Sequence, residues 1–111
     1  MDDRDPDDLD TVFRALADPS RRRLLDGLRA RDGRTLGELC DVLPDMTRFG
    51  VMKHVAVLAD AHLVVTERQG RTKLHYLNPV PIRGIHDRWI SRYAEPFVAG
   101  LTDLRRRSEG A

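Results

Sequence analysis

The chain has 111 residues, of which 41% are hydrophobic, a size that suits one small domain with a modest core. Its single cysteine, Cys40, excludes an internal disulfide and a zinc site built on paired cysteines. Because the sequence lacks an apolar run of bilayer length and its acidic N-terminus is unlike a secretion signal, we expect a cytoplasmic protein with no membrane partner.

The net charge of +1 conceals an uneven distribution of charge along the chain. Residues 1–10 hold six aspartates and one arginine, so the remainder carries 18 basic and 12 acidic groups, a net of +6. We expect residues 1–7 to be a disordered acidic tail, residues 8–107 one domain and residues 108–111 a second tail. A basic body suits a polyanion partner, although such charge on a small domain is often simply solvated.

Two helices are predicted in the first third of the chain. The first has an apolar face that consists of Leu9, Val12, Phe13 and Leu16. Asp18 then serves as the N-cap of a second helix, with Pro19 at its first position and Gly33 at its end. The buried face of this second helix consists of Leu24, Leu25 and Leu28.

Three arginines, Arg21, Arg22 and Arg23, lie in the first turn of this second helix. Positive charge in the first turn of a helix opposes the helix dipole and costs roughly 0.3–1 kcal/mol for each group. An anionic partner would offset that cost. Two partners are open: a DNA phosphate, or an internal group such as a carboxylate of the first helix.

A helix-turn-helix is predicted over residues 35–60. Thr35 and Glu38 form a capping box at the start of a third helix, in which each side chain satisfies a backbone amide of the other. The buried face of this helix consists of Leu36, Leu39 and Leu43. Pro44-Asp-Met46 makes a short break, and a fourth helix begins at Thr47. This spacing is typical of DNA-binding helix pairs, and a generic helical hairpin shares it.

The fourth helix has two distinct faces. Its packing face consists of Val51, Val55 and Leu58. The other face consists of Arg48, Phe49, Met52, Lys53 and Ala56. A face with basic and apolar groups and no carboxylate is unusual for a solvated helix and suits the DNA major groove. An ordinary amphipathic helix is the alternative.

A β-hairpin is predicted after the fourth helix. Leu63–Arg68 is rich in β-branched residues, and Lys73–Leu77 returns as a second strand with Leu74 and Tyr76 on one side and Lys73 and His75 on the other. The polar and basic residues at its tip are Arg68, Gln69, Arg71 and Lys73. Behind a helix-turn-helix, such a hairpin is a wing that grips phosphates. We therefore expect a mainly α fold with a small β-hairpin, a winged helix-turn-helix.

A long last helix is predicted after Asn78-Pro-Val-Pro81. Its apolar stripe consists of Ile82, Ile85, Trp89, Tyr93, Phe97, Leu101 and Leu104. Pro96 is expected to kink or split this helix near Glu95. One small winged helix has too little surface to cover the stripe, so pairing of the first and last helices with those of a second chain would bury it. Folding back onto its own core is the alternative.

Four segments carry a resemblance to a known family. They are Ala17-Asp-Pro-Ser-Arg-Arg22, the helix Leu36–Val42, Lys53-His-Val-Ala-Val-Leu58 with Ala61-His-Leu-Val64, and Tyr76-Leu-Asn-Pro79. In order and spacing they resemble the ArsR-type winged-helix repressors from about Leu9 to Leu104, and most closely the members without obvious metal ligands. The resemblance implies a homodimer held by the first and last helices, which binds a partly palindromic operator near its own promoter and represses transcription.

The resemblance also implies which residues contact DNA and the second chain. The family's base-reading positions fall on Arg48, Phe49, Met52, Lys53 and His54 of the fourth helix. Thr47, as the N-cap of this helix, is suited to a hydrogen bond with a phosphate. Arg48 and Lys53 suit guanine O6 and N7, and Phe49 or Met52 suits a thymine methyl. Phe49 departs from the small residue or proline expected at its position, and His54 suits a structural role equally well. The dimer contacts are expected at Leu9, Val12, Phe13, Ile85, Trp89, Tyr93, Phe97, Leu101 and Leu104.

Effector sensing is where the sequence departs from the metal-responsive members. Their third helix carries Glu-Leu-Cys-x-Cys, whereas Glu38-Leu-Cys-Asp-Val42 keeps only Cys40, and a lone thiolate makes no soft-metal site. Other members bind zinc through Asp and His on the last helix. Here His86 and Asp87 are adjacent and are expected to point in different directions. We expect no metal and no cofactor, and Cys40 is either buried packing or a redox sensor.

Two functional classes follow from these patterns. The leading one is a sequence-specific DNA-binding transcriptional regulator, with double-stranded DNA and a second copy of the chain as partners. The alternative is a winged-helix protein-interaction or sensory module without specific DNA binding. An enzyme is not expected, because the sequence has no nucleophile-His-Asp pattern and no phosphate-binding glycine loop.

Overall fold

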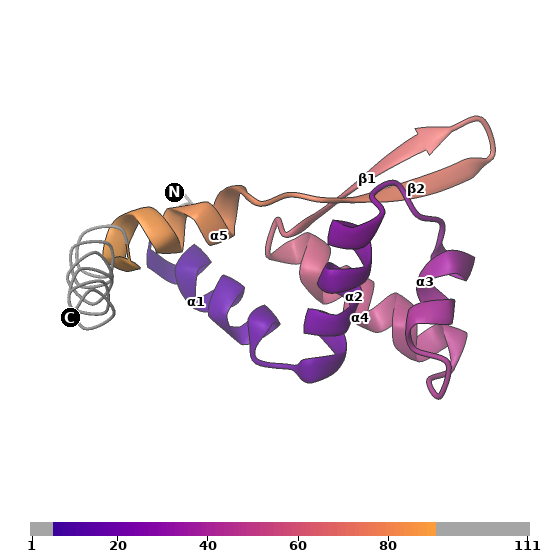
Figure 1. Ribbon diagram of the computed structural model, residues 1–111, viewed down its shortest axis with the longest axis horizontal. Coiled ribbons are helices and arrows are strands. Elements are labelled where there is room, and N and C mark those ends of the chain that lie inside the picture. Colours follow the sequence, from indigo (N-terminus) through magenta and orange to yellow (C-terminus); the bar gives the residue numbers. More distant parts are fainter. Residues whose placement is uncertain (1–5, 91–111) are drawn as a thin grey trace, which may run out of the picture. The chain divides into compact units, whose positions relative to one another are not determined.

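A computed structural model of the chain describes residues 6–90. Helices α1 (Pro6–Leu16), α2 (Pro19–Ala30), α3 (Leu36–Val42) and α4 (Arg48–Asp60) precede strands β1 (Val64–Gln69) and β2 (Thr72–Leu77). Helix α5 (Val80–Ile85) and a π-helical turn (His86–Ile90) follow. This order and the antiparallel hairpin confirm the predicted winged helix-turn-helix (Figure 1). Within the described residues, none of the helices is long and apolar enough to span a membrane.

Backbone contacts divide the chain after Pro81 into two compact units, where the sequence suggested one domain over residues 8–107. In the first unit, helix α1 already begins at Pro6, so the last two residues of the expected acidic tail are helical. The core of this unit lies among α2, α3, α4 and the start of β1. Its fully buried large side chains are Leu24, Leu28, Leu39, Val51, Leu58 and Leu63.

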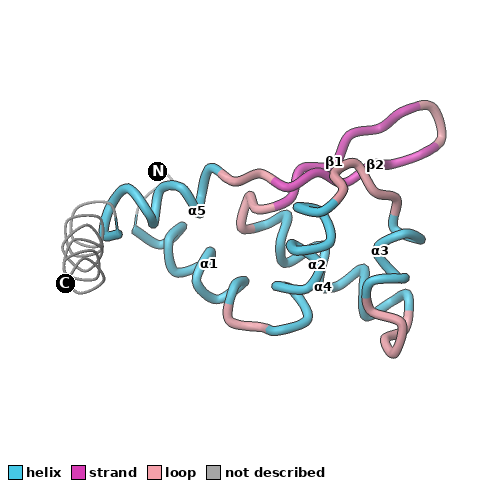
Figure 2. Tube along the Cα trace, viewed as in Figure 1, coloured by secondary structure: helices cyan, strands magenta, loops and turns pink. Residues whose placement is uncertain are grey.

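The predicted helix starts are confirmed in detail. The Asp18 carboxylate accepts hydrogen bonds from the backbone N–H groups of Ser20 (2.7 Å) and Arg21 (3.2 Å) at the start of α2. At α3, Thr35 Oγ1 accepts from Glu38 N (3.1 Å) and a Glu38 carboxylate oxygen accepts from Thr35 N (2.9 Å), which completes the capping box. Thr47 Oγ1 accepts from Gly50 N at 3.0 Å and so caps α4. Figure 2 shows α3 and α4 joined by one short loop.

The predicted end of α2 at Gly33 is wrong. The helix ends at Ala30, and its C-cap Arg31 is extended with φ −151° and ψ 107°. Tertiary pairing is the physical reason, because Arg34 forms an antiparallel bridge with His75 of β2 and the chain must extend to reach it. Gly33 has a φ of +75°, and a Cβ there would lie 3.1 Å from the Tyr76 ring, so glycine serves this connection and not the helix.

Both strands of the hairpin reach one residue closer to the turn than predicted, and β1 begins one residue later. Strand β1 runs from Val64 to Gln69 and β2 starts at Thr72, so the turn contains only Gly70 and Arg71. The register pairs Val64 with Leu77 and Gln69 with Thr72. Gly70 has a φ of +62°, a left-handed conformation that favours glycine at the tip.

The second unit begins within the predicted last helix. Helix α5 ends at Ile85 and the backbone continues as a π-helical turn to Ile90. Tyr93, Phe97, Leu101, Leu104 and the predicted kink at Pro96 lie outside the described residues.

Candidate nucleic-acid interface

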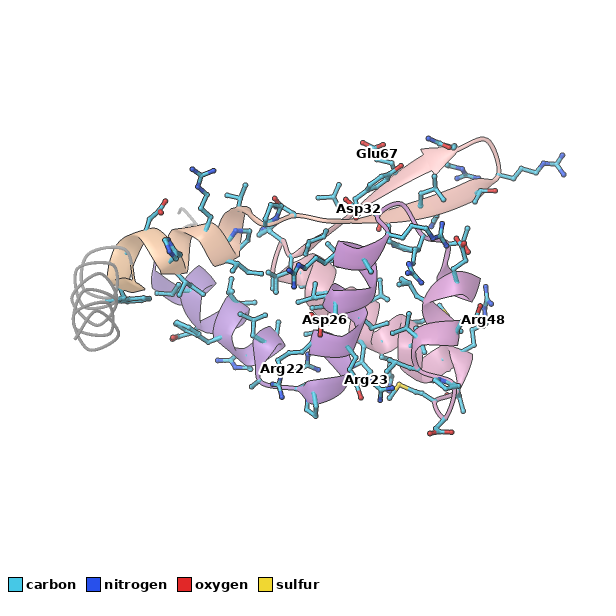
Figure 3. The ribbon with its side chains drawn as sticks, in the orientation of Figure 1. Arg22, Arg23, Asp26, Asp32, Arg48 and Glu67 are labelled. Carbon is cyan, nitrogen blue, oxygen red and sulfur yellow. The ribbon has the colours of Figure 1, made fainter. Side chains whose placement is uncertain are left out.

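The second face of α4 is open to solvent along its length. Phe49 is 65% exposed and Met52 48% exposed, although both are large apolar side chains, and Arg48, Lys53 and Ala56 are exposed beside them. Arg48 lies at the N-terminal end of the helix and points outward (Figure 3). The opposite face, Val51, Val55 and Leu58, is buried as predicted. Apolar groups held in solvent beside cations give this face the composition of a binding surface.

His54 does not belong to that exposed face. Its side chain is half-buried, and its Nδ1 lies 3.3 Å from Nη1 of Arg21 in α2. The ring therefore contacts the neighbouring helix, which favours the structural role over base contact.

The arginines at the start of α2 find internal partners. Arg21 donates from Nε to the backbone oxygen of Ala15 (2.8 Å) and from Nη2 to that of Arg14 (3.0 Å). Arg22 donates to the backbone oxygen of Leu16 at 2.7 Å. The partially negative C-terminal carbonyls of α1 thus offset the unfavourable charge, and they are an internal partner other than the α1 carboxylate that the sequence suggested.

Asp18 adds a carboxylate to this cluster. Its Oδ2 lies 3.7 Å from Nη1 of Arg21. Burial raises the pKa of Asp18, but the two backbone hydrogen bonds at the N-cap and the nearby Arg21 charge outweigh burial and lower it below its usual value. The negative charge that caps α2 therefore persists in mild acid.

The predicted wing residues Arg68, Gln69, Arg71 and Lys73 are all exposed. Arg68 donates from Nε to the backbone oxygen of Gly70 at 3.1 Å, which shapes the tip. Figure 1 shows the hairpin extending past α3, so its basic tip stands clear of the helices of the first unit. The wing can therefore reach a ligand that contacts the open face of α4.

The sequence patterns did not identify two residues that connect the hairpin to the rest of the first unit, His75 and Asp32. His75 is only 7% exposed, and its Nδ1 lies 3.0 Å from Thr66 Oγ1 while its backbone pairs with Arg34. Burial, and secondarily the charge of Lys73, lower the pKa of His75 below its ordinary value. Asp32 accepts a hydrogen bond from Leu77 N at 2.8 Å (Figure 3). No local sequence pattern predicts these contacts, because the partners lie up to 45 residues apart in the chain.

The expected dimer residues divide by exposure. Val12 is buried within the first unit, whereas Leu9 is half-buried and Phe13 is 43% exposed. In the second unit Ile85 is half-buried and Trp89 is 41% exposed, with the Arg88 guanidinium 5.3 Å from the Trp89 ring. Phe13 and Trp89 thus each leave a large part of their apolar surface exposed to solvent.

The side chains considered for metal binding do not gather into a site. His86 and Asp87 were expected to point apart, but Nδ1 of His86 lies 3.5 Å from Oδ1 of Asp87, because their side chains turn toward each other within the π-helical turn. Cys40 is half-buried with a free thiol. Within residues 6–90, no three His, Cys, Asp or Glu side chains come together in a way that could hold a metal ion.

A capped helix with an open basic and apolar face, beside a basic wing, defines a winged helix-turn-helix DNA-binding protein. A family model described as a helix-turn-helix domain matches residues 16–67. The uncharacterized HTH-type transcriptional regulator YuzN of Bacillus subtilis (strain 168) is 37% identical over 86 residues, which is 73% of this chain and 94% of that protein.

Solved structures extend these comparisons. The crystal structure of an ArsR family transcriptional regulator matches with a TM-score of 0.68 at 33% identity, over 83% of this chain and 92% of that chain. The solution structure of a homodimeric winged helix-turn-helix DNA-binding domain from Mycobacterium bovis, a possible ArsR-family regulator, shares the fold with a TM-score of 0.62 at 21% identity, over 83% and 87% of the two chains. The chain belongs to the ArsR family of DNA-binding transcriptional regulators, as the resemblance predicted.

Proposed function

We propose that the chain is a homodimeric repressor that binds a partly palindromic operator near its own promoter. The observation that carries this proposal is the exposed face of α4, where Phe49 and Met52 stand in solvent beside Arg48 and Lys53 with no carboxylate on that face. Exposure of these apolar groups to water is unfavourable. Binding in a groove that offers thymine methyls and guanine acceptors is favourable, because it covers the apolar groups and gives the cations acceptors.

Each part of the interface has a distinct role in this proposal. Arg48 and Lys53 contact guanine O6 and N7, and Phe49 or Met52 packs on a thymine methyl. Thr47 contacts a phosphate at the helix N-terminus. The wing residues Arg68, Gln69, Arg71 and Lys73 contact the backbone and supply affinity without reading bases. His54 takes no part, since it faces Arg21.

The homodimer is supported by exposed aromatic side chains and by a relative. Phe13 and Trp89 present aromatic surface at the two helices that the family resemblance assigns to dimerisation. The Mycobacterium bovis domain of the same fold is homodimeric. Two copies related by a two-fold axis would place two α4 helices on half-sites about one helical turn apart or a multiple of it, near 10 bp. Operator palindromy follows from this symmetry.

A protein-interaction module and an enzyme are the competing functions. The described site lacks the paired nucleophile and base that catalysis requires, and the binding chemistry of α4 suits DNA. The deciding experiment titrates a labelled duplex from the gene's own upstream region and a scrambled duplex of equal length at one salt concentration. We expect the upstream duplex to bind at least about 10³-fold more tightly. Equal affinities would leave only the interaction-module function.

The operator itself follows from selection of bound sequences from a random duplex pool. Two inverted half-sites in the selected pool support a dimer on a palindrome, and a single half-site contradicts it. A promoter fusion then decides the sign of regulation: a repressor lowers reporter output when the chain is expressed, and raised output would make it an activator.

A further inference from the structure

A groove of about 680 Å³ lies within the first unit between α3, the open face of α4 and the hairpin. Its apolar floor consists of Leu36 from α3 and Met52, Val55 and Ala59 from α4. This volume falls within the range of sites that bind small molecules. The floor residues belong to α3 and α4, two helices with capped N-termini and buried core residues.

The charges around the groove are of one sign. Arg48, Arg71 and Lys73 line it, and none of the described residues that line it is an aspartate or glutamate. His75 also lines the groove, and because burial lowers its pKa it favours the neutral form and adds no further charge near neutral pH. An apolar floor with three cations selects a molecule that has an apolar body and an anionic end.

DNA alone does not account for these features. Phosphates use the cations that line the groove and a thymine methyl can pack on Met52, but the polyanionic backbone does not bury the other aliphatic side chains, Leu36 and Ala59. Arg48, Met52, Arg71 and Lys73 nevertheless belong both to the groove and to the DNA contacts proposed above. A molecule seated in the groove would occupy the surface that DNA needs.

We propose that this groove binds an amphipathic organic anion, an apolar body with a single carboxylate or sulfonate, and that its occupancy excludes DNA. The binding site stands on the groove alone, whereas the exclusion of DNA rests on the proposed function. The anion thereby competes directly with the operator, with no conformational change required of the fold.

The first test uses 8-anilinonaphthalene-1-sulfonate and its uncharged counterpart N-phenyl-1-naphthylamine as fluorescent probes of the full chain. We expect the sulfonate to bind saturably at one site per chain and at least about tenfold more tightly than the neutral probe. Leu36→Gln, at a half-buried position in the first turn of α3, and Ala59→Gln should each weaken sulfonate binding about tenfold. Val57→Gln, at an exposed apolar position of α4 outside the groove, should leave it unchanged.

Equal binding of the two probes, or equal weakening by the Val57 variant, overturns the site. Urea denaturation shows whether each variant is folded. If one of the two floor variants is unfolded, the other still tests the site. The second test adds the sulfonate to a labelled duplex bound to the chain. Release from the wild type but not from Leu36→Gln supports competition, and a duplex that stays bound while the sulfonate occupies its site overturns it. A wild type that binds no duplex contradicts the proposed function, while the probe titration still decides the site.

Discussion

The Lys53 ammonium lies 4.9 Å from the centroid of the Phe49 ring, one helical turn away on the exposed face of α4. Phe49 is the residue that departs from the pattern expected from the family resemblance, and this contact gives it a role besides the proposed packing on a base. The negative face of the ring attracts the cation and holds the Lys53 side chain along the helix. Phe49 therefore sets where Lys53 presents its charge.

Removal of the ring should loosen Lys53 without unfolding the chain. Phe49→Leu is expected to weaken binding of the selected operator about two- to fivefold, which is the equivalent of about 0.5–1 kcal/mol for an exposed cation–π contact. Phe49→Tyr keeps an aromatic face and should bind like the wild type. Fluorescence anisotropy of the two variants, combined with Lys53→Met in a double-mutant cycle, measures the coupling. Additive effects would mean that the ring and the cation act independently.

Mutations should distinguish the residues that contact bases from the residues that contact phosphates. Arg48→Ala is expected to cost about 1–3 kcal/mol on the selected operator and to relax base preference. Arg71→Ala should weaken all duplexes alike and reduce the slope of log affinity against log salt by about 1. Salt titrations with operator and scrambled duplexes measure both effects, with Arg29→Ala on α2 as a charge-matched control. The opposite pattern would place the wing, not α4, in the reading position.

Stability should depend strongly on Arg21. Arg21→Met removes a charged donor from two α1 carbonyls and is expected to lower the free energy of unfolding by roughly 2–3 kcal/mol. Arg29→Met, at an exposed position of the same helix, should change it by no more than about 0.5 kcal/mol. Urea denaturation measures both. A loss no larger for Arg21 than for Arg29 would show that water replaces the guanidinium at the α1 terminus.

The stability of the folded chain should rise with pH through the titration of His75. The pKa of His75 in the folded chain lies below 6.5, its ordinary value, which the unfolded chain retains. Between these two pKa values the unfolded chain binds more protons than the folded chain, so acidification favours unfolding. The stability that His75 contributes is fully present above its pKa in the unfolded chain and is lost as the pH falls through its pKa in the folded chain. The urea midpoint should thus be lower at about pH 5 than at about pH 8. His75→Gln should reduce this difference, and an unchanged difference would assign it to other groups.

Association should depend on the aromatic side chains at both helices. Phe13→Gln and Trp89→Gln are each expected to raise the dimer dissociation constant at least about thirtyfold, since truncation of a central aromatic anchor costs about 2 kcal/mol or more. Sedimentation over a concentration series measures this, and Val57→Gln provides an exposed apolar control. A dimer that tolerates both changes would use another surface.

Local chemistry made most of the first unit predictable. Asp18, Thr35 and Thr47 announce helix starts because a side-chain oxygen followed by free amides acts within four residues. The buried faces of α2 and α4 followed from spacing alone. The open face of α4 could also be predicted, because residues that do not pack must face solvent or a ligand.

Tertiary contacts explain what the sequence could not disclose. The partners of Arg21 and Arg22 are backbone carbonyls, which every residue carries and no pattern marks. The sequence leaves two roles open for His54, because its partner Arg21 lies 33 residues away in the chain. Gly33 is a left-handed residue, as expected of a glycine near a helix end, but the bridge from Arg34 to His75 ended the helix earlier.

The bridge between Arg34 and His75 also determines which sheet edge stays open. It covers β2 on its outer side at that residue, whereas β1 pairs with β2 alone among the described strands. An uncovered strand can pair with a strand of another molecule and begin aggregation. Strand β1 is only six residues long, and four of these residues are exposed and polar: Thr66, Glu67, Arg68 and Gln69. Both features disfavour such pairing. The charges on this strand thus keep separate molecules from adding to the wing while its tip remains free for a ligand.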